Sequence, residues 1–192
     1  MLKRIIATCC RALRRFENSE AGVGAIEFAI LAPPFFLLLG CICETGLMFF
    51  TEYTLQTAVQ DAARLVRTGQ AQGGALTATT FKDKICNLTS VLVSCSGINV
   101  YVRSDTNFAT LASNMPVLLN IGPSVAGSTS ASACFNPGAP SQPAAVVATY
   151  DWNFNMWGMR SLGNINGNAT RRLIGFAIFQ NEPFPSSASS TC

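Results

Sequence analysis

The chain has 192 residues and contains no histidine, which excludes catalysis and metal binding through an imidazole group. Only 12% of its residues are charged and 49% are hydrophobic, whereas soluble domains have about 25% charged residues. The net charge of +3 is too small to indicate a nucleic-acid partner, and five of the 13 cationic side chains precede residue 16. The surplus of apolar residues therefore predicts a membrane segment or an export signal.

A membrane-spanning helix is the first element that we expect. Residues 28–43 carry no charge, and the apolar character continues to Phe50 with Glu44 as the only interruption. A hydrocarbon core of roughly 30 Å needs about 20 helical residues, which this segment supplies. Because Lys and Arg gather on the cytoplasmic side of a membrane, residues 1–22 should form a basic cytoplasmic leader, and the chain after about residue 50 should be exported. A plain signal anchor and a cleaved secretory signal peptide are the alternatives.

The segment from Gly22 to Phe28 places a carboxylate at the edge of the apolar run. Glu27 is the fifth residue after Gly22, and an acid at a membrane-helix edge is costly unless it has a partner. If the chain were cut after Gly22, the new α-amino group of Val23 would lie one helical turn from Glu27 on the same face. The two charges could then neutralise each other, within one subunit or between neighbours.

An amphipathic stem is expected to continue the helix beyond the membrane. Apolar residues recur there at helical spacing, and no strong breaker lies between residue 35 and Gly69. We therefore predict one helix over 23–68, followed by a linker at 69–78. Its apolar stripe must be covered by the C-terminal domain or by another subunit, and it is the candidate assembly face. The stripe consists of Leu55, Ala58, Val59, Ala62, Leu65 and Val66.

Residues 79–192 should form one exported α+β domain with a small antiparallel sheet. A short helix is predicted from Phe81 to about Asn87, and strands at 98–103, 144–152 and about 173–179. The third strand is apolar on both faces and is therefore expected to be central. The uncharged, Gly- and Ser-rich segment 121–143 should be a long loop, and the Asn-Gly step within 163–168 should form a turn.

The eight cysteines divide by predicted compartment. Cys9 and Cys10 are cytoplasmic, Cys41 and Cys43 lie in the apolar run, and the exported set is Cys86, Cys95, Cys134 and Cys192. An even number in an oxidising compartment predicts disulfides, and four cysteines permit three pairings. We favour Cys86 with Cys95 and Cys134 with Cys192, because the first two are close and the last would otherwise leave a free tail. A zinc site is the alternative, although no CxxC spacing and no His supports one.

Several of these segments resemble the TadE-like pseudopilins of tight-adherence (Flp-type) pili. The basic leader ending in Gly22, the AIEFA run with Glu27 and Phe28, the stretch TLQTAVQDAARLVRTG, the placement of Cys86 and Cys95, and the closing NEPF carry the resemblance. It implies a pilin-like fold and cleavage after Gly22 by a prepilin peptidase. It also implies a single-pass bacterial inner-membrane protein with a periplasmic or pilus-borne domain. The implied partners are the bilayer, other pseudopilins, the major pilin and the inner-membrane assembly platform of this adhesion and secretion system.

The residues are compatible with three classes of function. The resemblance implies a minor pseudopilin, without cofactor, in which Gly22, Val23, Glu27 and Phe28 serve processing and assembly. A signal-anchored binding or adhesin domain with no pilus role is the alternative. An exported enzyme is disfavoured, because the few exported carboxylates show no acid/base spacing and no phosphate-binding loop is present. Asp151 and Glu182 are interpreted as structural groups.

Overall fold

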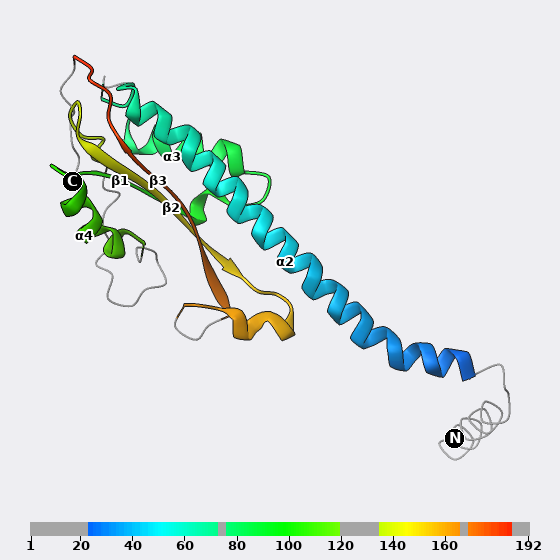
Figure 1. The fold of residues 1–192 in the computed structure, drawn as a ribbon. Helices are drawn as coiled ribbons and strands as arrows, with labels where there is room; N and C mark the ends of the chain where they lie inside the picture. Colours follow the sequence, from blue (N-terminus) through cyan, green and yellow to red (C-terminus); the bar gives the residue numbers. More distant parts are fainter. Residues whose placement is uncertain (1–22, 73–75, 120–134, 166–168, 186–192) are drawn as a thin grey trace, which may run out of the picture. The chain divides into compact units, whose positions relative to one another are not determined.

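Helix α2 (Val23–Arg67) opens the part of the chain that the computed structural model describes, which comprises residues 23–72, 76–119, 135–165 and 169–185 (Figure 1). The predicted helix over 23–68 is thus confirmed, and Pro33 and Pro34 lie inside it. The chain divides into two compact units, which meet in sequence between Cys43 and Glu44. The first unit contributes only helical residues, 23–43, to the described structure. The sheet and the remaining helices belong to the second.

Gly69 ends α2 with a left-handed backbone conformation, φ 79°. Its N–H donates to the carbonyl of Val66, and the N–H of Gln70 donates to that of Leu65, so the last helical carbonyls are satisfied. Glycine adopts this conformation without steric cost, which is why it terminates helices so often. The predicted stop at Gly69 therefore has the expected cause. Residues 73–75 of the predicted linker lie outside the described residues.

The sheet has three antiparallel strands, β1 (Ile98–Ser104), β2 (Pro143–Asn153) and β3 (Thr170–Gln180), in the order β1-β2-β3. The α+β class and all three predicted strands are confirmed. The expectation that the third strand is central is wrong: β2 is central, and its residues 143–149 are all buried. β3 lies at an edge, although it is apolar on both faces. One face of β3 packs against α2, and Phe176 and Ile178 on the opposite face are exposed.

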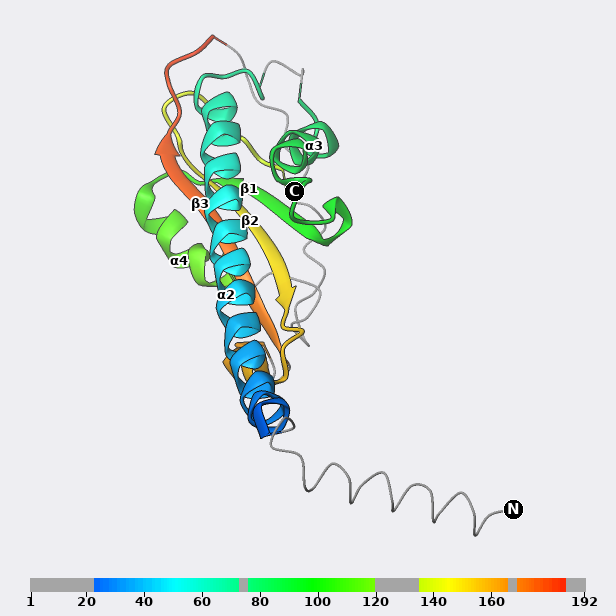
Figure 2. The same ribbon diagram turned by 90° about the vertical axis from the view of Figure 1, so that its right-hand side faces the viewer.

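Helices cover both faces of the sheet. Helices α2 and α3 (Ala78–Thr89) lie on one face and α4 (Phe108–Leu119) on the other (Figures 1 and 2). The predicted short helix is α3, which begins earlier because Thr77 and Thr80 form a reciprocal capping box. We did not predict α4. Its local signal was Asn107, whose Oδ1 accepts a hydrogen bond from the N–H of Thr110 at 2.9 Å, as an N-cap does.

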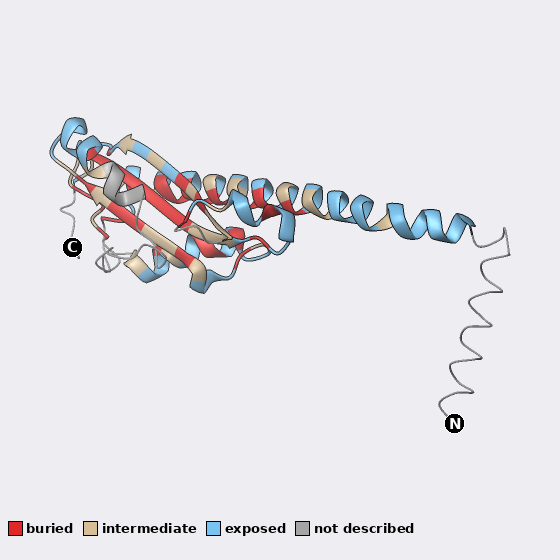
Figure 3. Ribbon diagram, turned by 90° about the horizontal axis from the view of Figure 1, so that it is seen from below, coloured by how far each residue is buried: buried red, intermediate tan, exposed pale blue. Residues whose placement is uncertain are grey.

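The core of the second unit lies where these layers meet. Burial is concentrated on the central strand, on the sheet-facing side of α2 and under α3, whereas residues 23–43 of α2 are almost entirely exposed (Figure 3). The largest fully buried side chains include Phe81, Leu55, Ile85, Ile98, Leu111 and Leu173.

Two short 3-10 helices complete the described structure: η2 (Cys95–Gly97), just before β1, and η3 (Trp157–Leu162), between β2 and β3. The predicted turn at 163–168 lies partly outside the described residues. Within it, the N–H groups of Asn164 and Ile165 both donate to the carbonyl of Thr170. The larger part of the predicted loop at 121–143 also lies outside them. Its end returns to the sheet, where Phe135 forms a parallel bridge with Val102.

Candidate processing and assembly site

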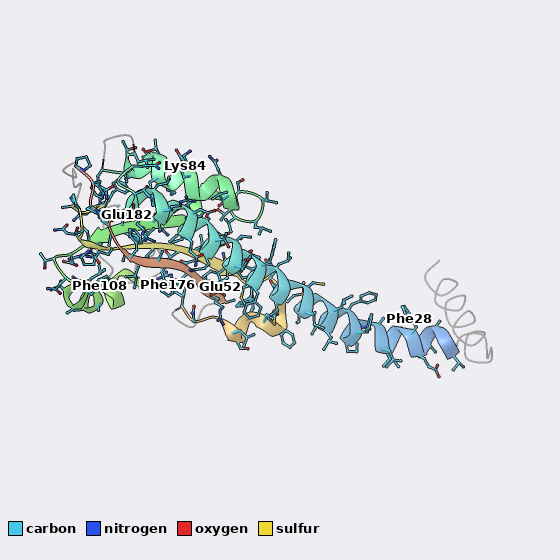
Figure 4. The ribbon with its side chains drawn as sticks, turned by 45° about the horizontal axis from the view of Figure 1, so that its top comes forward. Phe28, Glu52, Lys84, Phe108, Phe176 and Glu182 are labelled. Carbon is cyan, nitrogen blue, oxygen red and sulfur yellow. A yellow bond between two sulfur atoms is a disulfide. The ribbon has the colours of Figure 1, made fainter. Side chains whose placement is uncertain are left out.

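The predicted processing residues lie at the start of α2. Val23, Glu27 and Phe28 are helical and exposed, and Figure 4 shows Phe28 standing out from the first turns. Val23 and Glu27 are four residues apart and so lie on one face, as expected. Gly22 lies outside the described residues. The structure therefore presents the segment next to the predicted cleavage point as an uncovered helix.

The apolar part of α2 is the one described helix that is long enough and apolar enough to cross a membrane. None of its most apolar stretch is buried within the chain. A soluble protein rarely exposes so many large apolar side chains together. The exposed residues of this run include Phe28, Ile30, Leu31, Phe35, Phe36, Leu37, Leu38, Leu39 and Ile42.

Glu44 directly follows the apolar run and is buried, with 7% of its surface exposed. One carboxylate oxygen accepts a hydrogen bond from the N–H of Asn155 at 2.6 Å, and the other accepts one from Met156 at 3.1 Å. Sequence reasoning treated this acid only as an interruption of the run. The signal that could have identified it is the same one that drew attention to Glu27: a carboxylate within an apolar helix needs a partner.

The apolar stripe of the stem is covered within the chain, where β3 packs against Leu55 and Val59 and α3 lies beside Ala62 and Leu65. Five of its six residues, Leu55, Ala58, Val59, Ala62 and Val66, are buried, and Leu65 is partly buried. Of the two covers that the sequence allowed, the C-terminal domain and another subunit, the structure thus has the first, and the role of the stripe in assembly stays a prediction. The folded domain takes the place that a neighbouring subunit would otherwise fill.

Gly175 of β3 lies directly against the backbone of α2. A Cβ atom at this position would lie 3.0 Å from the carbonyl oxygen of Leu55 and 3.1 Å from a methyl group of Val59. Those distances are tighter than ordinary van der Waals contact, and one of them involves backbone. A glycine is thus what lets the helix backbone rest directly on the strand.

The helix also occupies part of the free edge of β3. The Gln56 side chain donates from Nε2 to the carbonyl of Phe176 and accepts at Oε1 from its N–H, both at 2.9 Å. Beside this contact is an open groove of about 600 Å³ between α2 and β3. Its lining residues are Gln56, Gln60, Ala63, Arg64, Arg67 and Phe176–Phe179.

The NEPF motif, residues 181–184, ties the end of β3 to the end of α2. Asn181, 3% exposed, donates from Nδ2 to the carbonyls of Pro137 and Ala139 at 2.8 and 3.1 Å. The N–H of Glu182 donates to the carbonyl of Arg67, and the two side chains form an ion pair at 3.5 Å. The Phe184 ring packs against Gly69, where a Cβ would approach it to 2.7 Å.

Two of the predicted site cysteines form a disulfide. Cys86 of α3 is bonded to Cys95 of η2, which joins the helix to the start of β1. Cys134 and Cys192 lie outside the described residues, so their pairing stays a prediction. Within the described ranges, no group of three or more His, Cys, Asp or Glu residues is placed to hold a metal ion.

Asp151 and Glu182, which we interpreted as structural, each contact an arginine. Asp151 forms a two-pronged contact with Arg172, with Nε to Oδ1 at 2.8 Å and Nη2 to Oδ2 at 3.1 Å. Both partners are largely buried between neighbouring strands, whereas the Glu182 pair is half exposed. These carboxylates stabilise the fold at the two ends of β3.

Comparison with known proteins adds one finding. Residues 22–64 match the family model described as TadE-like protein. The match begins at Gly22 and covers the exposed apolar run together with most of the stem. No curated protein and no solved structure matches the chain significantly.

Proposed function

Because residues 22–64 form a TadE-like segment, we propose that the chain is a membrane-anchored minor pseudopilin that takes part in assembling a tight-adherence pilus. The observation that carries this proposal is the family match from Gly22 onward over a helix whose apolar first part the chain leaves uncovered. An exposed apolar helix has to be covered by lipid or by other helices. A pilus subunit meets both, first in the membrane and then in the fibre.

We further propose that a prepilin peptidase cleaves after Gly22 and frees the α-amino group of Val23. The amine and the Glu27 carboxylate then lie one turn apart on an exposed helix face. In a dry environment two unpaired charges are far more costly than a neutralised pair. Pairing within one helix, or between adjacent helices in a bundle, would set the lateral register of the subunits.

The exported domain has a different role in this proposal. The stem stripe is already buried within the chain, so the stem and the domain would enter assembly as one folded body and not as a bare helix. Contacts with other pilus components, the pilins and the assembly platform, would then use the exposed start of α2 and the outer surfaces of the domain.

The test is Glu27→Gln, with Glu52→Gln as the matched control. Glu52 lies on the same helix but outside the uncharged run, and Figure 4 shows it on the stem. We expect Glu27→Gln to abolish or strongly reduce piliation without reducing membrane retention, and Glu52→Gln to leave both unchanged. Normal piliation by Glu27→Gln would disprove the role given to this carboxylate.

Cleavage is tested separately, by intact mass and N-terminal sequencing of the chain from its native membrane. A mature chain that begins at Val23 supports the pseudopilin proposal. One that begins at Met1 and does not copurify with pilus components supports the signal-anchored binding domain instead. Cleavage also changes charge: removing five cations and two anions leaves eight of each, so the mature side chains sum to zero.

A further inference from the structure

The η3 segment exposes large apolar side chains although it is part of a folded domain. Trp157 is 82% exposed and Leu162 52% exposed, and Met156 just before them is also exposed. Met159, between them, is buried and attaches the segment to the domain. Tryptophan is enriched where one end of its ring meets an apolar phase and the other meets water. The segment thus has the composition of a membrane-interface contact.

Glu44 determines where this segment lies. Its carboxylate holds the N–H groups of Asn155 and Met156, the two residues that lead into η3. Glu44 is joined by one peptide bond to Cys43, the last residue of the uncharged run 28–43. The segment is therefore tied by hydrogen bonds to the residue that directly follows the apolar run in the chain.

The charges of the segment fit a lipid surface as well. No acidic residue occurs from Trp152 to Thr170, and Arg160 within η3 is exposed. Cations flanking apolar residues favour the phosphate level of a bilayer. The helix contributes further exposed apolar side chains just after Glu44: Leu47, Phe49, Phe50 and Tyr53.

We propose that η3 is a second membrane contact, in which Trp157 and Leu162 enter the interface of the bilayer that α2 crosses. This inference rests on the proposed membrane anchoring and extends it. The occupant of the exposed surface is lipid, because the segment is hydrogen-bonded to Glu44, the residue that directly follows the uncharged run 28–43. The anchored subunit would then meet the bilayer at two places, and Glu44 would connect them.

Tryptophan fluorescence of the full chain in lipid nanodiscs tests this proposal. The chain has two tryptophans, so Trp152→Phe leaves Trp157 as the only one. This substitution is mild, because the buried Nε1 of Trp152 has no hydrogen-bond partner among the described residues. The discs contain phosphatidylcholine and phosphatidylglycerol in equal parts, with the acyl chains brominated near the headgroup. The matched control is Trp157→Phe, which retains only Trp152.

We expect bromine to lower Trp157 emission by about twofold more than Trp152 emission, as for a ring in the interface. Equal quenching of the two tryptophans, in protein retained in the disc, overturns the proposal and leaves membrane anchoring intact. Blue-shifted Trp157 emission that depends on the number of chains per disc also overturns it, in favour of a contact with a second copy. Chains that do not enter the discs and are extracted from membranes by alkaline carbonate disprove the anchoring itself.

Glu44→Gln tests whether the hydrogen bonds of Glu44 position η3, because it leaves the residues of η3 unchanged. The amide can accept only one of the two backbone hydrogen bonds, and its NH₂ group faces the other donor. In the Trp152→Phe background we expect this variant to lose most of the bromine quenching while it stays in the disc. Glu52→Gln in the same background should keep it. Full quenching in Glu44→Gln would disprove the role assigned to Glu44.

Discussion

The Gln56 side chain makes with Phe176 the two backbone hydrogen bonds that a neighbouring β-strand would make. Nε2 donates to the Phe176 carbonyl and Oε1 accepts from its N–H, both at 2.9 Å. An exposed strand edge is a template for pairing with another chain, and proteins protect such edges. Here the protection comes from the helix, at the middle of β3.

Replacing Gln56 by Ala should open this edge. We expect the loss of two hydrogen bonds to lower the free energy of unfolding by about 2 kcal/mol. The amide of Phe176 should also exchange its hydrogen faster, which mass spectrometry of peptides from β3 would detect. Gln60→Ala is the matched control, since Gln60 lines the same groove and its side chain makes no hydrogen bond among the described residues. Equal exchange in the two variants would contradict the edge-protecting role.

Gly175→Ala should separate helix from sheet. The added methyl group would meet the carbonyl oxygen of Leu55 at 3.0 Å and Cα of Gln56 at 3.2 Å, and backbone cannot turn aside as a side chain can. Overpacking of this kind costs about 2 kcal/mol in unfolding free energy, measurable by denaturant titration in detergent. The matched control is Gly46→Ala in α2, where an added Cβ would have nothing within 4 Å. This substitution should be neutral or should raise the free energy of unfolding by up to about 1 kcal/mol. A tolerated Gly175→Ala would show that α2 can shift.

Alanine substitutions at two adjacent residues of the NEPF motif should differ sharply in their effect on the free energy of unfolding. Asn181→Ala leaves the buried carbonyls of Pro137 and Ala139 without this donor and should cost about 2 kcal/mol of unfolding free energy. Glu182→Ala removes an ion pair that is half exposed and should cost less than about 1 kcal/mol. Chemical denaturation of both variants under one set of conditions compares them. The opposite order would mean that the ion pair, and not the buried amide, holds the end of β3.

Tyr101 should make stability fall at alkaline pH. Burial raises the pKa of its hydroxyl above the ordinary 10.0, and the charge of Arg172 lowers it only in part. The unfolded chain therefore releases this proton first. The stability contributed by the neutral hydroxyl is complete below pH 10 and is lost as the pH rises through the folded-state pKa.

Unfolding measurements on either side of pH 10 would check this expectation. Tyr101→Phe should lose less stability across that window than the parent chain. Tyr53→Phe, at an exposed position, is the control and should follow the parent. If Tyr101→Phe also follows the parent, the alkaline loss comes from other groups.

Local patterns were sufficient for most of the fold. The apolar run and the absence of breakers predicted α2, Gly69 predicted its end, and alternation predicted β1. The close spacing of Cys86 and Cys95 likewise favoured the disulfide that is present. Such features depend on neighbours within a few turns of the chain, which a single sequence displays.

The place of β3 and the helix α4 were not predicted. An apolar strand can be central, or it can lie at an edge where a helix covers one of its faces. Only the pairing with β2 and the packing of α2 against Gly175 distinguish these two arrangements. For α4, one capping asparagine in a segment without a clear pattern was too weak a signal.

By itself, therefore, the sequence determined the long apolar helix, its exposed Val23–Glu27 face and the strands that follow. Only the tertiary structure decided that the stem stripe is buried within the chain, that Gln56 protects an edge, and that Glu44 binds the backbone of the residues that lead into η3. The reason is physical. Periodicity shows which side chains must be buried or paired. The hydrogen bonds that Glu44 and Gln56 make join residues more than a hundred positions apart in the chain, which a local pattern does not reveal.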